Sequence, residues 1–329
     1  MGRIKVGQIG VGHLGTMHCS ALMDLAEVDL QGVFDLDFEK SRSVASKFKV
    51  KSYATLDALL SQVQAVIVAV PTRSHHEVVK KALANNVHVF VEKPITAEVE
   101  EAEELIRIAD DRKSILQVGH IERFNPALAA LNREALHPRF IEARRLATFN
   151  KRGTDVAVVL DLMIHDLDII LNLVDSSVAS FEASGVAVVS SEIDIANARI
   201  QFKNGCVANV TASRISQKRI RGMRLFQKDA YISLDFMNRS AGIYRLCKKP
   251  VASPNHRTVL LGSFKRNGVE NYIAYEDLEV PSVDPLKSEL SAFLQCVRSG
   301  ASPPVDGVAG KRVLQLAIDI TRTIEKQNT

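Results

Sequence analysis

The spacing of an aspartate and a histidine, Asp161 and His165, is the first feature of this chain that could support chemistry. Both lie in a long apolar run, residues 156–174, that predicts a helix. Residues four apart lie about one helical turn apart, so the carboxylate and the imidazole would project from the same face. A carboxylate beside an imidazole can orient the ring and raise its basicity near neutral pH. The pattern favours a general base for a hydroxyl group, with a surface ion pair or a packed core histidine as the structural alternatives.

A glycine-rich turn near the start of the chain predicts a dinucleotide site. An apolar strand pattern runs into a G-x-G-x-x-G motif and then into a helix pattern. Gly10 would permit the tight turn, Gly12 the approach of a pyrophosphate, and Gly15 close packing of the helix on the strand. The phosphates would lie on N–H groups at the start of the helix. We expect His13 and Leu14, within the motif, to contact the cofactor as well.

The acidic residue that follows the second predicted strand favours NAD as the cofactor. The strand pattern of residues 28–34 ends at Asp35, 20 residues after Gly15. A carboxylate at this distance accepts hydrogen bonds from the ribose 2′-hydroxyl and repels the 2′-phosphate of NADP. Asp37 is the alternative acceptor, and its structural alternative is a solvated loop charge.

Apolar strands and helices then alternate, which predicts a doubly wound Rossmann domain over residues 1–120. Ligands bind at the carboxyl ends of the strands in such a sheet. We therefore expect Val70, Pro71 and Thr72, and also Glu92 and Lys93, to border the nicotinamide site. The predicted strands are residues 65–70, 87–91 and 115–118, and the predicted helices are residues 76–85 and 98–111.

The remainder, residues 121–329, predicts an α/β domain for substrate binding and oligomerisation, with an open, mostly antiparallel mixed sheet. Asn204-Gly205 lies between two strand patterns and is typical of a hairpin turn. Many strands with few helices leave one sheet face open, so we expect a homodimer or a homotetramer. The predicted strands are residues 140–148, 178–189, 193–202, 206–213, 224–227, 231–235 and 243–247.

Composition excludes several classes of protein. Of the 329 residues, 42 are basic and 38 acidic, and the net charge of +4 is too small and scattered to predict nucleic-acid binding. The densest basic stretch, residues 214–228, is interrupted by apolar residues and favours a sheet with one wet face. Four dispersed cysteines predict reduced thiols, no apolar run predicts a membrane span, and no signal peptide is expected, so we expect a cytoplasmic protein.

Four motifs, in this order and spacing, resemble the Gfo/Idh/MocA oxidoreductase family. They are the glycine motif, Pro71-Thr-Arg-Ser-His75, Glu92-Lys93-Pro94 and Asp161-x-x-x-His165. The resemblance implies a Rossmann domain followed by an open mixed-sheet domain, and substrates that are commonly sugars or cyclitols. It implies that Lys93 lies between nicotinamide and substrate, although an exposed loop lysine is the alternative. It also implies a cis Lys93–Pro94 bond, an acid/base pair of Asp161 and His165, and help from His75 in positioning the cofactor, for which capping or packing is the alternative.

Within that family, the segments around residues 119–126, 148–155 and 160–168 resemble the UDP-N-acetylglucosamine 3-dehydrogenase branch. The resemblance implies that a secondary hydroxyl of a sugar nucleotide, at C3 of UDP-N-acetylglucosamine, is oxidised to a ketone. Arg123, Asn125 and Arg152 are the candidates for holding the diphosphate, with pairing between domains as their alternative. The functional alternatives are a dehydrogenase of a free sugar, inositol or other polyol, and a non-catalytic NAD(P)-binding regulatory protein.

A metal site is the remaining possibility at the acid/base pair. Asp168 lies three residues beyond His165, so Asp161, His165 and Asp168 could hold a divalent ion. Hydride transfer to NAD needs no metal, and Asp166 and Asp168 have hydrogen bonds to loop backbone as their alternative role. We therefore predict no metal site.

Overall fold

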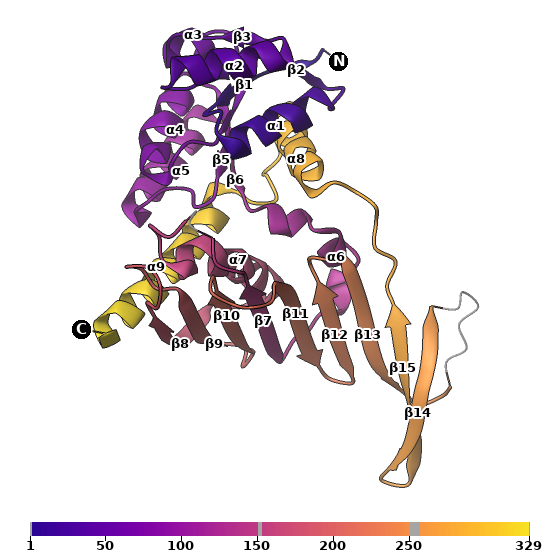
Figure 1. The fold of residues 1–329 in the computed structure, drawn as a ribbon. Coiled ribbons are helices and arrows are strands. Elements are labelled where there is room, and N and C mark those ends of the chain that lie inside the picture. Colours follow the sequence, from indigo (N-terminus) through magenta and orange to yellow (C-terminus); the bar gives the residue numbers. More distant parts are fainter. Residues whose placement is uncertain (1, 151–152, 251–256, 329) are drawn as a thin grey trace. The chain divides into compact units, whose positions relative to one another are not determined.

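A computed structural model describes residues 2–150, 153–250 and 257–328, which form two compact units (Figure 1). The first unit is Met1–Ile121 with Val283–Gln315, and the second is Glu122–Ser282 with Leu316–Thr329. The first boundary lies one residue from the predicted boundary at residue 120. The return of the chain to the first unit was not predicted. It occurs because the helix α8 (Pro285–Ser299) buries apolar side chains in the core of that unit.

The first unit is built on a parallel sheet of six strands in the order β3-β2-β1-β4-β5-β6. All four residues of the central strand β4 are buried, as expected for a parallel sheet with both faces covered. This confirms the predicted doubly wound arrangement. The strands are β1 (Ile4–Ile9), β2 (Val28–Phe34), β3 (Lys51–Ser52), β4 (Ala65–Val68), β5 (His88–Glu92) and β6 (Leu116–Gly119).

The helices of the first unit begin at recognisable N-caps. Asp37 accepts a hydrogen bond from the N–H of Lys40 at the start of α2, and Glu98 and Glu101 form a capping box at the start of α5. The elements α2, β3 and α3 lie in a stretch where the sequence predicted no element. The helices are α1 (His13–Met23), α2 (Phe38–Phe48), α3 (Leu56–Leu60), α4 (His75–Ala84), α5 (Val99–Arg112), α8 and the first part of α9 (Gly307–Asn328).

The second unit is built on a nine-stranded sheet in the order β14-β15-β13-β12-β11-β7-β10-β9-β8. Among the described strands of this sheet, only β7 and β10 run parallel as neighbours, so the sheet is mixed and mostly antiparallel, as predicted. Gly205 takes a φ of +84° in the turn between β9 and β10, which confirms the predicted hairpin. The strands are β7 (Phe140–Leu146), β8 (Val178–Val186), β9 (Ile195–Phe202), β10 (Val207–Ser213), β11 (Ile220–Gln227), β12 (Ala230–Asp235), β13 (Ser240–Cys247), β14 (Thr258–Arg266) and β15 (Val269–Asp277).

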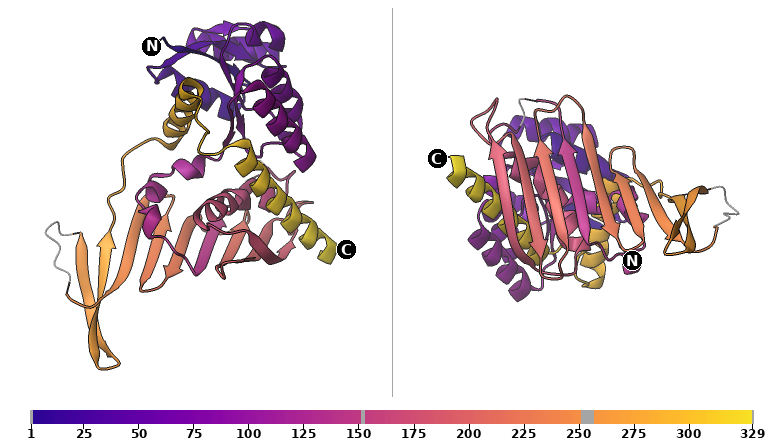
Figure 2. Two further views of the ribbon diagram at one scale, coloured as in Figure 1. Left: turned by 180° about the vertical axis from the view of Figure 1, so that it is seen from behind. Right: turned by 90° about the horizontal axis from the view of Figure 1, so that it is seen from below.

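The two faces of this sheet differ in burial. In β9 every second residue is buried, because one face packs under helices and the other does not. In the described part of the unit the helices lie on one face, and the view from below in Figure 2 shows strands with no helix over them. Five aromatic rings follow one another across this open face at centroid distances of 4.8–5.7 Å. They belong to Phe140, Phe226, Tyr231, Tyr244 and Tyr275.

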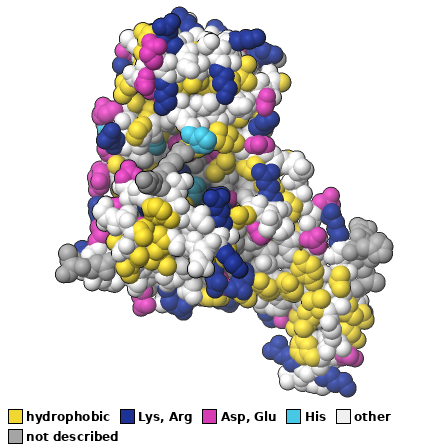
Figure 3. All heavy atoms as spheres, in the orientation of Figure 1, with side chains coloured by type: hydrophobic (Ala, Val, Ile, Leu, Met, Phe, Trp, Pro, Cys, Tyr) yellow, Lys and Arg dark blue, Asp and Glu magenta, His cyan; other side chains and the backbone are white. Residues whose placement is uncertain are grey.

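The last two strands form a hairpin, and the side chains of β14 are largely exposed on both faces, whereas β15 is exposed less and buries Ala274. In β14, Val259 and Leu261 are 52% and 55% exposed, and Phe264 is 41% exposed. Figure 3 shows hydrophobic side chains gathered over the part of the surface where Figure 1 places β14 and β15. The sequence did not predict these strands, because a strand exposed on both faces lacks the alternation of apolar and polar residues that marks a half-buried one.

One helical segment of the second unit connects two strands of its sheet. A π-helical turn (Val159–Met163) and α7 (Ile164–Leu173) carry the chain from β7 to β8, so the Asp161 and His165 segment lies in this crossover. The other helices are α6 (Pro126–Ala129) and the last part of α9. Among the described residues of both units, no helix has the length and apolar character that crossing a membrane requires.

Candidate active site

The glycine turn between β1 and α1 has the close contacts and the open space that a dinucleotide requires. A Cβ at Gly15 would lie 1.9 Å from the carbonyl oxygen of Gly10, so the helix approaches the strand as closely as glycine permits. Gly10 itself has a φ of +81°. At Gly12 a Cβ would meet only Lys40 Nζ, at 3.8 Å, so the backbone there is open to a ligand. Gly12 is the N-cap of α1 and has no side chain that could accept a hydrogen bond from the helix. The N–H groups at the start of α1 are therefore available for phosphate oxygens. These features fit NAD.

Asp35 lies at the end of β2, directly against the glycine turn. Its Oδ2 accepts a hydrogen bond from the N–H of Val11 at 2.8 Å, and its Oδ1 accepts one from the N–H of Asp37 at 3.0 Å. These bonds hold the carboxylate beside the place where the adenosine ribose is expected. The Asp37 carboxylate is exposed and caps α2, so its geometry favours Asp35 for the ribose.

The end of β5 holds a partly buried carboxylate beside Lys93. Glu92 Oε1 lies 2.7 Å from Nε2 of the buried His18, and Glu92 Oε2 accepts the N–H of Lys93 at 3.3 Å. Burial alone would raise the pKa of Glu92, but His18 and the charge of Lys93 hold that pKa below its usual value. Glu92 therefore stays anionic and fixes the backbone at Lys93. The Lys93–Pro94 bond is cis, which confirms the expectation from the resemblance.

His75 joins two loops on the same rim of the sheet. Its Nδ1 lies 2.8 Å from the carbonyl oxygen of Pro94 and its Nε2 lies 3.0 Å from that of Val70. Burial lowers the pKa of His75, so the ring is neutral at pH 7 and donates its single N–H to one carbonyl at a time. Both ring nitrogens therefore face backbone oxygens, and the geometry supports the packing alternative. The residues Pro71 and Thr72 follow Val70 at this rim.

The helix of Asp161 and His165 differs from the single α-helix predicted over residues 156–174. Residues Val159–Met163 form a π-helical turn, in which hydrogen bonds span five residues, and only from Ile164 does α7 begin. Asp161 lies inside the wide turn and His165 near the start of α7, and both are partly buried. A spacing of four residues stays within one such turn, so the two side chains still leave the same side of the helix. π-turns of this kind are frequent at functional sites.

The next two carboxylates on α7 are each held by an arginine. Arg145, from β7, donates to both oxygens of the fully buried Asp166 at 2.9 Å and to Glu122 at 2.8 Å. Burial alone would lower the pKa of Arg145, but the two carboxylates raise it further than burial lowers it. Arg123 donates to both oxygens of Asp168 at 2.7 Å. These ion pairs fasten α7 to the sheet and to the segment that precedes α6.

The ion pair between Arg123 and Asp168 bears on two hypotheses, the metal site and the role of Arg123 in binding the diphosphate. Both oxygens of Asp168 accept hydrogen bonds from a guanidinium, which disfavours a cation at Asp161, His165 and Asp168. The same bonds occupy two donors of Arg123, which is also only 10% exposed at its side chain. Asp166 and Asp168 therefore bind arginine side chains, and the loop-backbone role that we weighed for them was wrong.

Of the other two residues proposed for the diphosphate, Asn125 lies among the described residues. Asn125 is buried, caps α6 through the N–H of Ala127, and donates to Glu122 and to the carbonyl oxygen of Phe236. Its polar atoms thus have structural partners. Arg152 lies outside the described residues.

Two arginines from the basic stretch were not predicted to belong to the site. Arg221, at the start of β11, faces Arg145 across the strand pair, is 54% exposed and lies 3.8 Å from Glu122. Arg219 Nε donates to Thr148 Oγ1 at 3.3 Å. Both lie at the end of β7 from which the chain continues toward Asp161. Only the register of β7 with β11 reveals this, and that register cannot be read from the sequence.

Lys93 belongs to the first unit, whereas Asp161 and His165 belong to the second. Each unit thus carries one part of the predicted machinery. The first provides the glycine turn, Asp35 and a cation beside a fixed carboxylate. The second provides a carboxylate and an imidazole on one side of a π-turn, and arginines at the same end of the sheet.

Comparison with known families and proteins gives matches over both units. A family model described as an oxidoreductase family with an NAD-binding Rossmann fold matches residues 4–120. A model of the GFO/IDH/MocA C-terminal domain matches residues 131–231.

Two relatives and one solved structure extend these matches. The chain is 37% identical over 297 residues to the UDP-N-acetylglucosamine 3-dehydrogenase of Acidithiobacillus ferrooxidans, which covers 90% of each chain. It is 26% identical over 278 residues to the scyllo-inositol 2-dehydrogenase (NAD(+)) of Bacillus subtilis, which covers 79% of this chain and 75% of the relative. A solved structure of UDP-N-acetylglucosamine 3-dehydrogenase from A. ferrooxidans has a TM-score of 0.88 at 35% identity and covers 99% of each chain.

Proposed function

The chain belongs to the Gfo/Idh/MocA family of NAD-binding oxidoreductases, and on that premise we propose that it oxidises the 3-hydroxyl of UDP-N-acetylglucosamine to a ketone. The observation that carries the proposal is the identity of 37%, across 90% of both chains, to a relative with that activity. The acid/base groups that such a reaction needs are supplied by Asp161 in the π-turn and His165 near the start of α7. Lys93, beside the anionic Glu92, supplies a cation.

Residues of the first unit would hold the cofactor. The N–H groups at the start of α1, with His13 and Leu14, would bind the pyrophosphate across the open backbone at Gly12, and Asp35 would accept the ribose hydroxyls. Val70, Pro71 and Thr72 would border the nicotinamide, with His75 fixing the carbonyl of Val70. Bound NAD supplies the acceptor for the hydride.

Side chains of the protein accept the hydroxyl proton and stabilise the negative charge that develops on the hydroxyl oxygen. His165 takes the proton from the hydroxyl oxygen, and Asp161 orients the imidazole and stabilises its charged form. Lys93 donates a hydrogen bond to the same oxygen and stabilises the negative charge that develops there before the carbonyl forms. Glu92 and His18 fix the backbone from which the Lys93 side chain extends, which supports this role.

The diphosphate of the substrate needs cationic side chains whose charge is not already neutralised by a close ion pair within the protein. Arg221 is half exposed and shares Glu122 with the closer Arg145, so we assign it a diphosphate contact, with Arg219 beside it. Arg152 keeps the same proposed role. Arg123 and Asn125 keep the proposed role, although Arg123 already binds Asp168 and the Asn125 amide already donates to Glu122 and to the carbonyl oxygen of Phe236.

We also propose a cytoplasmic homodimer or homotetramer. The four cysteines are free thiols, in keeping with a reducing compartment. The aromatic side chains on the open sheet face and the apolar hairpin β14–β15 give a surface suited to a second copy. Light scattering of the purified protein measures the oligomeric state, and a monomer at micromolar concentration contradicts this part of the proposal.

The decisive experiment follows NADH absorbance with UDP-N-acetylglucosamine, other UDP-sugars, free N-acetylglucosamine and inositols. We expect the highest kcat/KM for UDP-N-acetylglucosamine. Reduction of the product with borodeuteride should place deuterium at C3 of the sugar. Deuterium at another carbon, or no NADH from any nucleotide sugar, contradicts the proposal. A free polyol as the best substrate establishes the second candidate, which the inositol dehydrogenase relative favours.

Variants test the residue roles and the regulatory alternative. His165→Gln and Lys93→Met should each lower kcat by at least about 10²-fold, the usual worth of a positioned acid/base group. The exposed residues His137 and Lys265 provide matched controls, and His137→Gln and Lys265→Met should retain wild-type kcat. Near-normal turnover of both site variants removes the proposed mechanism. Tight NAD binding without turnover of any substrate supports a regulatory protein.

A further inference from the structure

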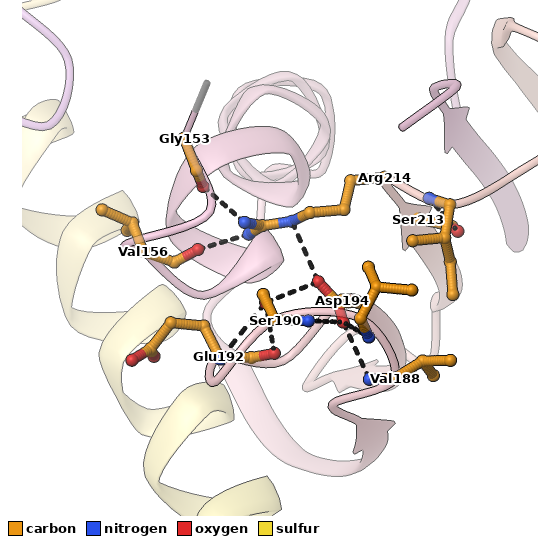
Figure 4. Close-up of polar contacts among 10 residues, drawn as sticks. Gly153, Val156, Val188, Ser190, Glu192, Asp194, Ser213 and Arg214 are labelled. Carbon is orange, nitrogen blue, oxygen red and sulfur yellow. Dashed lines mark hydrogen bonds and ion pairs between the residues drawn. The ribbon is translucent and has the colours of Figure 1, made fainter. Parts of the chain in front are cut away.

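A buried arginine outside the proposed machinery contacts the segment that leads into the π-turn. Arg214 follows β10 and is 5% exposed. Its guanidinium donates hydrogen bonds to the backbone carbonyl oxygens of Gly153 and Val156, as Figure 4 shows. These residues precede the first helical residue, Val158, by only a few positions. One side chain thus fixes two points on the chain just before Asp161.

The guanidinium is itself held by a buried carboxylate. Arg214 Nε lies 3.8 Å from Asp194 Oδ1, and the N–H of Arg214 donates to the carbonyl oxygen of Asp194 at 3.0 Å. Asp194 Oδ2 accepts hydrogen bonds from three consecutive N–H groups, at 2.7–3.0 Å, and Oδ1 accepts one from a serine hydroxyl at 2.7 Å (Figure 4). The donors belong to Val188, Val189 and Ser190. Asp194 is therefore a fixed negative charge at the turn between β8 and β9.

Gly153 connects this arginine to the proposed catalytic pair. Its φ is +79°, a conformation that favours glycine, and a Cβ placed on it would lie 3.1 Å from Asp161 Oδ2. The backbone of Gly153 therefore lies directly against the Asp161 carboxylate. The N–H of Val158 donates to the carbonyl oxygen of Ile193 at 2.8 Å, so the first helical residue is tied to the same β8–β9 turn.

We propose that Arg214 is a positioning residue for the oxidation, because through Gly153 it fixes the Asp161 carboxylate that orients His165. The inference rests on the roles that the proposed function gives to Asp161 and His165. The planar fork of arginine suits two carbonyl oxygens at fixed separation, whereas a lysine offers a single ammonium point. Replacing a buried ion pair with apolar residues of similar volume is often neutral for stability, so this pair is better explained by the geometry that it imposes.

The experiment compares Arg214→Lys and Gly153→Ala with the control Arg199→Lys. Arg199 is an exposed arginine on β9 that donates to Asn209, so the control makes the same substitution on the same sheet. Four quantities are measured in the purified, folded proteins: kcat and KM for UDP-N-acetylglucosamine, the Kd of NAD, and the imidazole nitrogen NMR signals of His165. The His165 signals are assigned by their loss in His165→Gln.

In both test variants we expect kcat to fall at least about tenfold, within the ~10²-fold that a 1 Å misplacement of a positioned group can cost. KM and the Kd of NAD should stay within about twofold, because Arg214 contacts the backbone that precedes Asp161 and has no proposed contact with substrate or NAD. The His165 signals should shift in both variants, and Arg199→Lys should change none of these quantities. A change confined to thermal stability, with kcat and the His165 signals as in wild type, overturns the proposal.

Two further outcomes are decided by the same measurements. If Arg214→Lys does not fold, Gly153→Ala decides, because it keeps the Arg214 and Asp194 side chains but strains the backbone at Gly153 and crowds the Asp161 carboxylate. If the wild-type protein oxidises no nucleotide sugar, the proposed function fails. The His165 signals then decide the positioning role separately, since unchanged signals in folded Arg214→Lys refute it and shifted signals support it.

Discussion

The buried carboxylate of Asp194 should make the stability of the second unit depend on pH in a predictable way. Burial alone would raise its pKa, but the hydrogen bonds from Val188, Val189 and Ser190 lower the pKa from the usual 3.8 to about 2. A difference of nearly two pKa units between the unfolded and folded states corresponds to about 2 kcal/mol of stability. The contribution is complete above the unfolded pKa and is lost as the pH falls toward the folded pKa. About half of it should be gone at pH 3.

The perturbation is Asp194→Asn, which keeps the shape of the side chain and removes its charge. Denaturant unfolding at pH 7 should show the variant about 2 kcal/mol less stable than the wild type, and the difference should shrink to about 1 kcal/mol at pH 3. Hydrogen exchange provides a local measurement, because the amides of residues 188–190 should lose protection in the variant. Asp110, an exposed residue on α5, is the matched control, and Asp110→Asn should leave both measurements unchanged.

Two results would refute this reasoning. A stability difference of the same size at pH 7 and pH 3 means that the variant loses packing or hydrogen bonds and that titration of Asp194 contributes nothing. A difference that grows toward pH 3 means that the folded protein holds the carboxyl in its protonated form, the reverse of what three N–H donors and Arg214 impose.

Three further predictions follow from individual contacts. Arg145→Met leaves the carboxylates of Glu122 and Asp166 buried without their cation and should cost about 3–5 kcal/mol in denaturant unfolding; a loss below about 1 kcal/mol contradicts the assignment. Asp35→Ser removes the charge that repels a 2′-phosphate. The ratio of the Kd for NADP to the Kd for NAD, measured by cofactor fluorescence, should therefore fall about tenfold. An unchanged ratio assigns the discrimination between the two cofactors to another residue. Arg221→Gln should raise KM for UDP-N-acetylglucosamine about tenfold, which is the effect of losing one charge-assisted hydrogen bond. KM for free N-acetylglucosamine should stay unchanged. Equal increases in both KM values contradict the diphosphate role of Arg221.

The sequence was sufficient wherever the chemistry of a short segment decides its structure. The strand β2 occupies the predicted residues 28–34, because apolar runs between turn residues have few alternatives in a parallel sheet. Asn204-Gly205 forms the predicted hairpin because few residues tolerate the positive φ seen at Gly205. The cis bond before Pro94 was expected from the resemblance alone.

The sequence was insufficient wherever a partner comes from a distant segment. Arg123 meets Asp168 across 45 residues, so its ion pair cannot be inferred from local pattern. The helix α8 shows an amphipathic pattern in the sequence, but that pattern does not say which sheet it covers. The π-turn at Asp161 has no propensity signal of its own, and it arises where the segment before it is fixed by contacts with Arg214 and Ile193.

The parallel pair β7 and β10 has a consequence for how this unit is made. The crossover helix α7 leaves β7 and returns to the sheet at β8, and the strands that fill the gap between them, β9 and β10, are translated afterwards. On the ribosome, the helix that bears His165 thus emerges before part of the surface on which it packs. Until residues 207–213 have paired with residues 140–146, α7 can pack on β7 but not on β10. Nascent chains stalled in this interval should be held by chaperones, and any chain cut short before Ser213 should carry both proposed acid/base residues without the support that orients them.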